Sequence, residues 1–263
     1  MEHEIAIRIA AFAGVLAVLV GLERLAPRRP LLQPRSRRWF TNLALVVIDT
    51  LTVRALALAL PILAVAAAVD AEGLGLGLFN QTALPGWVET LLAVLIFDFA
   101  IWLQHLITHK VPLFWRFHRV HHADRDFDVT TALRFHPVEI AASSAVKVGL
   151  VYLIGPSVLA VILFEVLLNA TAMFNHANLR LPLGLDRVVR LVLVTPDMHR
   201  VHHSARRDEH DSNYGFSLSI WDRMFRTYVP QPAAGHDAMT VGLEWQDDRP
   251  MKLTWALWLP FRR

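Results

Sequence analysis

The segment WVETLLAVLIFDFAIWLQHLITHK, residues 87–110, decides the fold class, because an apolar run ends directly in two histidines. A bilayer-spanning helix needs about 20 predominantly apolar residues, and this run supplies them despite the acidic residues Glu89 and Asp98. His105 and His109 are four residues apart, so their rings project from the same face of a helix. The segment therefore predicts a membrane helix that carries two imidazoles toward one site.

Three further apolar stretches cover about residues 5–22, 42–69 and 138–175. The second can span with tilt or break near Pro61, and the third, interrupted at Gly155-Pro156, can form two spans or a re-entrant hairpin. The composition agrees, since 54% of the residues are hydrophobic, 19% are charged and the mean hydropathy is +0.39. We expect an all-α integral membrane bundle of about four spans.

The distribution of arginine predicts the orientation of these spans. Short cytoplasmic loops retain Lys and Arg. Residues 70–86, between the 42–69 stretch and the 87–110 segment, contain neither. Six arginines lie at the first connection: Arg24, Arg28, Arg29, Arg35, Arg37 and Arg38. We predict an outer N-terminus, a cytoplasmic histidine-rich region, and an arginine run that contacts lipid headgroups. Trp255 and Trp258 indicate that the C-terminal tail lies along the membrane interface.

Histidine is unusually concentrated in the middle of the chain. Eleven of the 13 histidines among 263 residues fall between His105 and His210. The chain has no cysteine, which excludes thiolate metal sites, disulfides and iron–sulfur clusters, and its net charge of +3 gives no support for a nucleic-acid partner. Ten histidines form five short motifs: His105-x-x-x-His109, His118-x-x-His121-His122, His136, His176 and His199-x-x-His202-His203.

This pattern predicts a metal centre. Many imidazoles crowded beside a membrane are unfavourable when protonated together, whereas a divalent metal satisfies neutral ring nitrogens. Ten ligands exceed the coordination number of one ion, so two ions are expected. Zinc suits imidazole, although the chain lacks the His-Glu-x-x-His signature of zinc proteases. Iron is preferred, because a thiolate-free histidine site beside a membrane suits dioxygen chemistry on a hydrophobic substrate.

The order of the histidine motifs resembles that of the fatty acid hydroxylase/sterol desaturase superfamily. The supporting strings are FWRFHRVHH at 114–122, TTALRFHP at 130–137, FNHAN at 174–178, NYG at 213–215 and WDR at 221–223. The resemblance extends over about residues 97–228. It implies a membrane-bound di-iron oxygenase of the monooxygenase type, which hydroxylates or desaturates an unactivated C–H position of a lipid with O2 and external electrons, as part of lipid metabolism.

The resemblance also implies the ligands and partners. The expected ligands are His105, His109, His118, His121, His122, His136, His176, His199, His202 and His203. They would hold two iron ions, with zinc as an alternative in the protein as isolated. The expected partners are a lipid, the membrane, and a separate electron-transfer protein or small reductant, since residues 1–90 contain only anchor spans and loops. Residues 91–230 are then the catalytic domain, and residues 231–263 an interfacial tail.

Several polar residues are candidates for supporting the ligands. Asp98 lies two helical turns before His105 and can accept the outer N–H of a ligand ring, or pair with Arg54. Glu165 and Asn169 share a helix face with His176 and predict a polar stripe toward the metals. Asn175 and Asn178, which flank His176, complete the supporting set. We interpret His210 as a surface histidine, and the acidic residues Asp124, Asp126 and Asp128 as a solvated loop.

Two functions of other classes compete with the oxygenase. A histidine-lined divalent-metal transporter would also be apolar and rich in histidine, but its ligands should lie within the spans near the bilayer midplane. A metal-stabilised membrane scaffold would tolerate the loss of single ligands. Sequence alone does not name the lipid, the electron donor or the oligomeric state.

Overall fold

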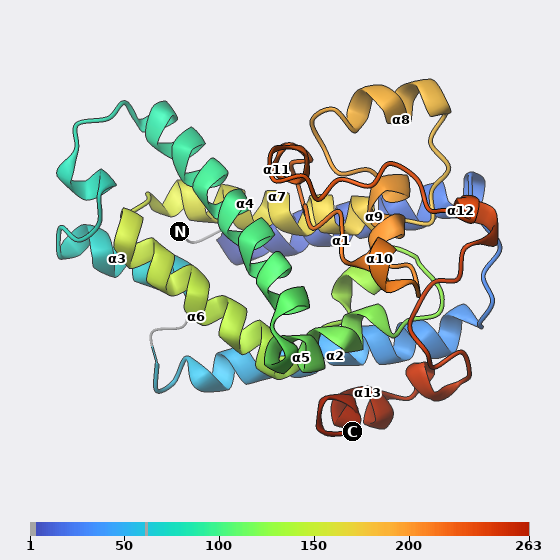
Figure 1. Ribbon diagram of the computed structural model, residues 1–263. Coiled ribbons are helices and arrows are strands. Elements are labelled where there is room, and N and C mark those ends of the chain that lie inside the picture. Colours follow the sequence, from blue (N-terminus) through green and yellow to red (C-terminus); the bar gives the residue numbers. More distant parts are fainter. Residues whose placement is uncertain (1–3, 61–62, 263) are drawn as a thin grey trace.

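A computed structural model describes residues 4–60 and 63–262, and all regular secondary structure within these ranges is helical (Figure 1). Five of its helices are long and apolar enough to cross a membrane. They are α1 (Glu4–Leu25), α2 (Arg35–Leu56), α4 (Gly86–Lys110), α6 (Pro137–Ile154) and α7 (Val158–Asn175). The expected helical membrane bundle is confirmed, with five candidate spans in place of about four.

The last apolar region forms two full-length helices. Gly155 ends α6 with φ of +63°, which favours glycine, and the Ser157 side chain caps the start of α7. The turn between the helices lies against the loop that precedes α4, where Leu78 N donates to Leu153 O at 3.2 Å. A Cβ atom on Gly77 would lie only 2.2 Å from Gly155 N. The α6–α7 hairpin therefore extends as far as the loop at the distant end of the bundle.

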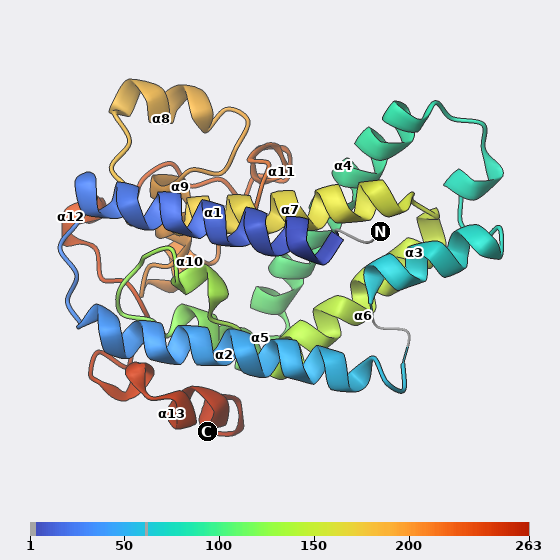
Figure 2. The ribbon, with the colours of Figure 1, turned by 180° about the vertical axis from the view of Figure 1, so that it is seen from behind.

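The second apolar region is broken, as the proline suggested, although Pro61 itself lies outside the described residues. After α2, the chain continues as α3 (Ala64–Gly73), which packs against α6 (Figure 2). Ten residues of helix span only about 15 Å, so α3 is too short to cross a bilayer.

The remaining chain is mostly gathered at one end of the bundle, where α1, α4 and α7 end and α2 and α6 begin (Figures 1 and 2). The shorter α-helices are α5 (Pro112–His122), α8 (Leu183–Val189), α9 (Pro196–His202), α10 (Arg207–His210), α11 (Ile220–Met224), α12 (Gly235–Ala238) and α13 (Leu253–Trp258). The 3-10 helices are η1 (Phe79–Gln81), η2 (Thr131–Leu133), η3 (Arg249–Met251) and η4 (Leu259–Phe261). Every described histidine motif lies at or beside this end.

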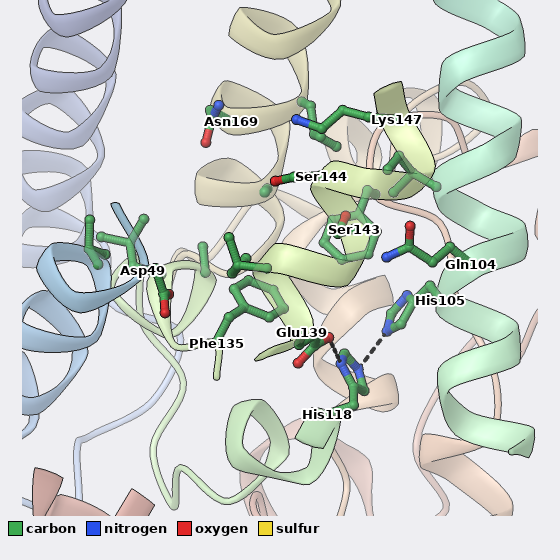
Figure 3. A pocket seen from close by; sticks show the side chains of 18 of the residues that line it. Asp49, Gln104, His105, His118, Phe135, Glu139, Ser143, Ser144, Lys147 and Asn169 are labelled. Atoms are coloured by element: carbon green, nitrogen blue, oxygen red, sulfur yellow. Dashed lines mark hydrogen bonds and ion pairs between the residues drawn. The ribbon is translucent and has the colours of Figure 1, made fainter. Parts of the chain in front are cut away.

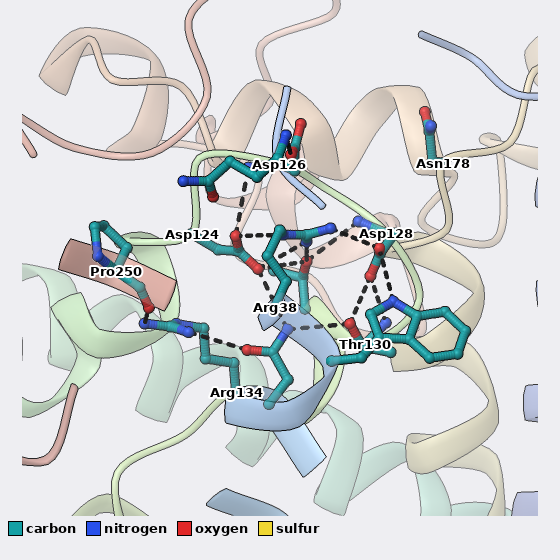
Figure 4. A network of polar contacts seen from close by, with 12 residues as sticks. Arg38, Asp124, Asp126, Asp128, Thr130, Arg134, Asn178 and Pro250 are labelled. Atoms are coloured by element: carbon teal, nitrogen blue, oxygen red, sulfur yellow. Dashed lines mark hydrogen bonds and ion pairs between the residues drawn. The ribbon is translucent and has the colours of Figure 1, made fainter. Parts of the chain in front are cut away.

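Arg38 connects α2 to the loop that follows the second histidine motif (Figure 4). Its guanidinium donates to Asp124 at 2.8 Å and to Asp128 at 2.7 Å, and all three side chains are buried. Burial alone would raise the pKa of Asp124, but the charge and hydrogen bonds of Arg38 bring it below its usual value. The solvated-loop interpretation is therefore wrong, and Arg38 pairs with protein carboxylates instead of lipid headgroups.

The C-terminal segment packs against the same end of the bundle. Trp255 is buried beside Leu45 of α2 and Val120 of α5, whereas Trp258 is exposed. Arg119 of α5 donates to Leu259 O at 2.6 Å. The segment thus contacts both α5, which carries the His118-x-x-His121-His122 motif, and α2.

Candidate metal centre

Nine buried histidines form two groups of ring nitrogens, and within each group one nitrogen per ring lies within 4.8 Å of the others. The first group contains His105, His109, His118, His122 and His202, and the second contains His121, His176, His199 and His203. Opposite nitrogen ligands of an ion with bonds of about 2.1 Å are separated by about 4.2 Å. Each group therefore has the dimensions of a site for one ion.

The helices place these rings. His105 and His109 lie in the last turns of α4. The next helix, α5, begins at Pro112, and proline is favoured in the first helical turn. α9 begins in the same way, with Pro196 after Thr195, whose side chain caps the helix. Two short helices thus start abruptly and deliver the two His-x-x-His-His motifs to the end of α4.

Hydrogen bonds at Nδ1 fix three of the five rings of the first group, those of His105, His118 and His202. His105 Nδ1 donates to Tyr214 O at 2.7 Å, and His118 Nδ1 donates to Glu139 Oε1 at 2.6 Å. When both rings are neutral, their Nε2 atoms carry only lone pairs, yet these atoms lie 3.1 Å apart. Two facing acceptors repel each other unless a cation lies among them. His202 has the same arrangement, with Nδ1 donating to Ser212 O at 2.6 Å and no protein partner for Nε2.

The second group is built around His176. Its Nδ1 donates to Ala172 O at 2.7 Å, and its Nε2 faces Nε2 of His121 at 3.2 Å and of His199 at 3.1 Å. Burial lowers the pKa of His176 to about 3. Burial and the neighbouring imidazoles also hold the pKa values of His121, His122, His199, His202 and His203 well below the usual value. These rings are neutral near pH 7, which is the form that binds metal.

His136 lies apart from both groups. Its Nδ1 accepts from Val138 N at 3.2 Å and caps α6, while its Nε2 donates to Leu257 O at 3.2 Å. Both nitrogens thus have protein partners in one neutral tautomer. The structure does not bring this residue to the metal centre, which corrects the tenth ligand implied by the resemblance. The position immediately before Pro137 is that of a helix cap, and the cap accounts for its placement.

The model of the fatty acid hydroxylase family matches residues 90–227, which include all nine clustered histidines. This chain belongs to the fatty acid hydroxylase family.

Curated relatives agree with the family assignment. Alkylglycerol monooxygenase of Xenopus tropicalis is 38% identical over 146 residues, which cover 55% of this chain and 31% of the relative. Its human counterpart is 36% identical over 143 residues, covering 54% and 30%. Ornithine lipid hydroxylase OlsE of Rhizobium tropici is 26% identical over 228 residues, covering 85% and 68%. The match thus spans about a third of the alkylglycerol monooxygenases, and no solved structure matches the chain.

The residues that we expected to support the metal ligands of this fatty acid hydroxylase family member do not contact the ligand rings. Asp98 accepts from Trp221 Nε1 at 2.8 Å and from Leu218 N at 3.3 Å, and no hydrogen bond joins it to His105 or Arg54 in the described chain. Asp98 therefore fixes the segment after Tyr214 and does not contact a ligand ring.

The expected polar stripe on α7 lies along cavities of the bundle: Glu165 and Asn169 both line two of them, and Asn169 also lines a third beside His105. Glu165 is paired with Lys147 at 2.6 Å and with Arg8, and Asn169 Nδ2 donates to Glu165 O at 2.7 Å. The stripe thus lies deeper in the bundle than the histidines.

The two asparagines beside His176 brace the backbone. Asn175 donates to Phe216 O at 2.6 Å, and Asn178 donates to Arg29 O at 2.8 Å. They secure neighbouring segments without contacting the clustered rings.

Sequence reasoning missed the groups that do hold the rings. The carbonyls of Tyr214 and Ser212 have no signature in a sequence, because every residue carries a carbonyl group. Glu139 has the position of an ordinary acidic residue in the first turn of a helix, yet it contacts His118. His210 is buried and stacks on Trp115 with ring centroids 5.4 Å apart, so the surface interpretation is wrong. Its neighbour Asp211 lies 3.4 Å from His109 Nδ1.

A chamber of about 280 Å³ adjoins the first histidine group (Figure 3). His105 and His118 form one side of it, Asp49 and Lys147 belong to its polar wall, and Phe135 contributes an apolar surface. The chamber gives a ligand direct access to the rings from the membrane-spanning part of the bundle.

Proposed function

We propose that this chain is a membrane-bound di-iron oxygenase that hydroxylates or desaturates an unactivated C–H position of a lipid with O2 and external electrons. One observation carries the proposal. Imidazoles of His105, His118 and His176, each oriented by a hydrogen bond at Nδ1, direct their Nε2 atoms toward other ring nitrogens in two adjoining groups. Such donor sets fit two metal ions, and imidazole without thiolate suits iron.

The nine clustered histidines are the proposed iron ligands. Two iron ions held there would supply the dioxygen chemistry that oxidises a C–H bond. The protein itself orients the rings through the Tyr214 and Ser212 carbonyls and through Glu139, which raises the basicity of His118. Burial of every clustered ring excludes bulk water from the site.

The proposed substrate is a lipid that enters the chamber from the bilayer. The relatives support this class, since their names are alkylglycerol monooxygenase and ornithine lipid hydroxylase. The five candidate spans support a chamber beside lipid, and the arginine pattern favours a cytoplasmic site with an outer N-terminus. A separate electron-transfer protein or small reductant would supply the electrons. We propose residues 91–230 as the catalytic domain, residues 1–90 as the anchor and residues 231–263 as a packed interfacial tail.

The transporter and the scaffold are less well supported. The donor groups lie at the end of the spans, whereas a transport site belongs near the bilayer midplane. A scaffold has no need of a chamber that opens onto its metal ligands.

Lipidomics under ¹⁸O₂ tests the proposal. Membranes containing the full chain should yield a lipid species that gains labelled oxygen or loses two hydrogens. Membranes containing the double variant His121→Ala/His202→Ala, which removes one ligand from each group, should not. An unchanged lipid profile with iron-loaded, folded protein and a supplied reductant would contradict the oxygenase.

A further inference from the structure

Three buried acceptor oxygens in the chamber have no hydrogen-bond donor among the residues that the structure describes. They are Asp49 Oδ1 from α2, Gln104 Oε1 from α4 and Glu139 Oε2 from α6 (Figure 3). A buried polar atom without a partner is costly, and a carboxylate oxygen is costlier than an amide. The chamber wall thus favours a ligand that brings hydrogen-bond donors.

Asp49 sets the charge that such a ligand must carry. It is only 7% exposed, and no ion pair or hydrogen bond joins its side chain to another described residue. Glu139, the other carboxylate of the chamber, adds negative charge nearby. Lys147 is the cationic side chain among those that line the chamber, and it is already bound to Glu165 at 2.6 Å. No cation among the described residues pairs with Asp49, and an ammonium bound beside this buried carboxyl group would favour its ionised form.

An apolar groove leads from the chamber toward lipid between α4, α5 and α6. It has a volume of about 470 Å³ and shares Gln104, Thr108, Glu139 and Ser143 with the chamber. Its other walls include Leu103, Phe114 and Val146, which are exposed on the surface of the bundle. The shared residues line both cavities, so the groove adjoins the chamber, which is the arrangement that a lipid with its acyl chain in the groove and its headgroup in the chamber requires.

We propose that the chamber selects a lipid whose headgroup carries a protonated primary amine, with the ammonium bound by Asp49. An ammonium supplies three N–H donors and a positive charge that pairs with the Asp49 carboxylate. Gln104 and Glu139 accept further N–H or O–H groups of the headgroup, and the acyl chain follows the groove. That amine lipids are substrates rests on the proposed function, whereas the preference of the chamber for binding them does not.

Binding of matched probes tests the proposal without turnover. The full chain in phosphatidylcholine nanodiscs is titrated with an oleoyl amide ending in a primary amine, with its N-acetylated form, and with monooleoylglycerol. The wild type should bind the amine at least about 10-fold more tightly than either neutral probe. Asp49→Asn should abolish this preference and Asp49→Glu should preserve it. Asp70→Asn, the same change at an exposed residue of α3, should leave the preference intact.

Each contrary result is decisive. Equal wild-type affinity for the amine and its N-acetylated form overturns the proposal even when Asp49→Asn does not fold. Binding of monooleoylglycerol as tight as that of the amine overturns it in favour of a neutral headgroup, and an amine preference that survives in folded Asp49→Asn overturns the role of Asp49. An amine preference in a protein that oxidises no lipid would instead refute the proposed function alone.

Discussion

His121 and His122 are consecutive residues of α5, yet they belong to different donor groups of the metal centre. Their ring planes are inclined by 86°, with centroids 5.3 Å apart. His202 and His203 of the other His-x-x-His-His motif are divided between the groups in the same way. Each His-x-x-His-His motif therefore joins the two groups, and this arrangement makes the ligand assignment testable one ion at a time.

Replacing either His121 or His122 with alanine should leave at most about one iron per chain and lower lipid oxidation at least about 100-fold. Each change removes a ligand from a different group, which elemental analysis of the purified protein measures. His136→Ala is the matched control, because His136 caps a helix outside both groups, and it should retain both ions. Two irons in both ligand variants would contradict the assignment.

Glu139→Gln should weaken metal binding by about 10- to 100-fold, because the neutral amide is a poorer acceptor for His118 Nδ1–H. Competition with a chelator measures the change in affinity. Glu89→Gln is the control, since Glu89 accepts from Ser157 N near the distant end of the bundle. Equal metal affinity in the two variants would show that the Glu139 contact does not tune the site.

Arg38→Met should destabilise the fold by about 3–5 kcal/mol, because it leaves two buried carboxylates without their cation. A fall of about 10 °C in Tm is expected for a chain of this size. Arg37 is exposed, so Arg37→Ala should change the free energy of unfolding by no more than about 0.5 kcal/mol. Thermal unfolding in detergent compares the two variants, and similar Tm values would refute the buried ion pair.

Ala142→Phe should reduce the oxidation of long-chain lipids more than that of short-chain analogues, because Ala142 lines the apolar groove. The ratio of kcat/KM for the two chain lengths is the measurement. Ala145→Phe introduces the same bulk at an exposed position of α6 outside the groove and should leave the ratio unchanged. A constant ratio in Ala142→Phe would place the acyl chain elsewhere.

The sequence was sufficient for the features that depend on local spacing. Apolar runs predicted helices α1, α4 and α7, and Pro61 suggested the break that separates α2 from α3. The histidine motifs predicted a clustered site, because residues at i, i+3 and i+4 of a helix share a face. The structure confirms this clustering for nine of the ten histidines.

Features that depend on tertiary packing were not predictable from one sequence. Arg38 and Asp124 are 86 residues apart, so nothing in their local context distinguishes a buried ion pair from two solvated charges. The division of His121 from His122 was not predictable either, because it depends on which rings of other helices surround each of them. His136 was misassigned because a helix cap and a metal ligand use the same imidazole nitrogens.

The shared use of α5 and α9 affects how the metal centre fills. A first ion that orders these two short helices also positions the rings of the second group, which lowers the entropy cost of binding the next ion. Loading of the metal-free chain should therefore be cooperative, with a titration curve steeper than that of two independent sites. Chains that hold a single ion would then be scarce at half saturation.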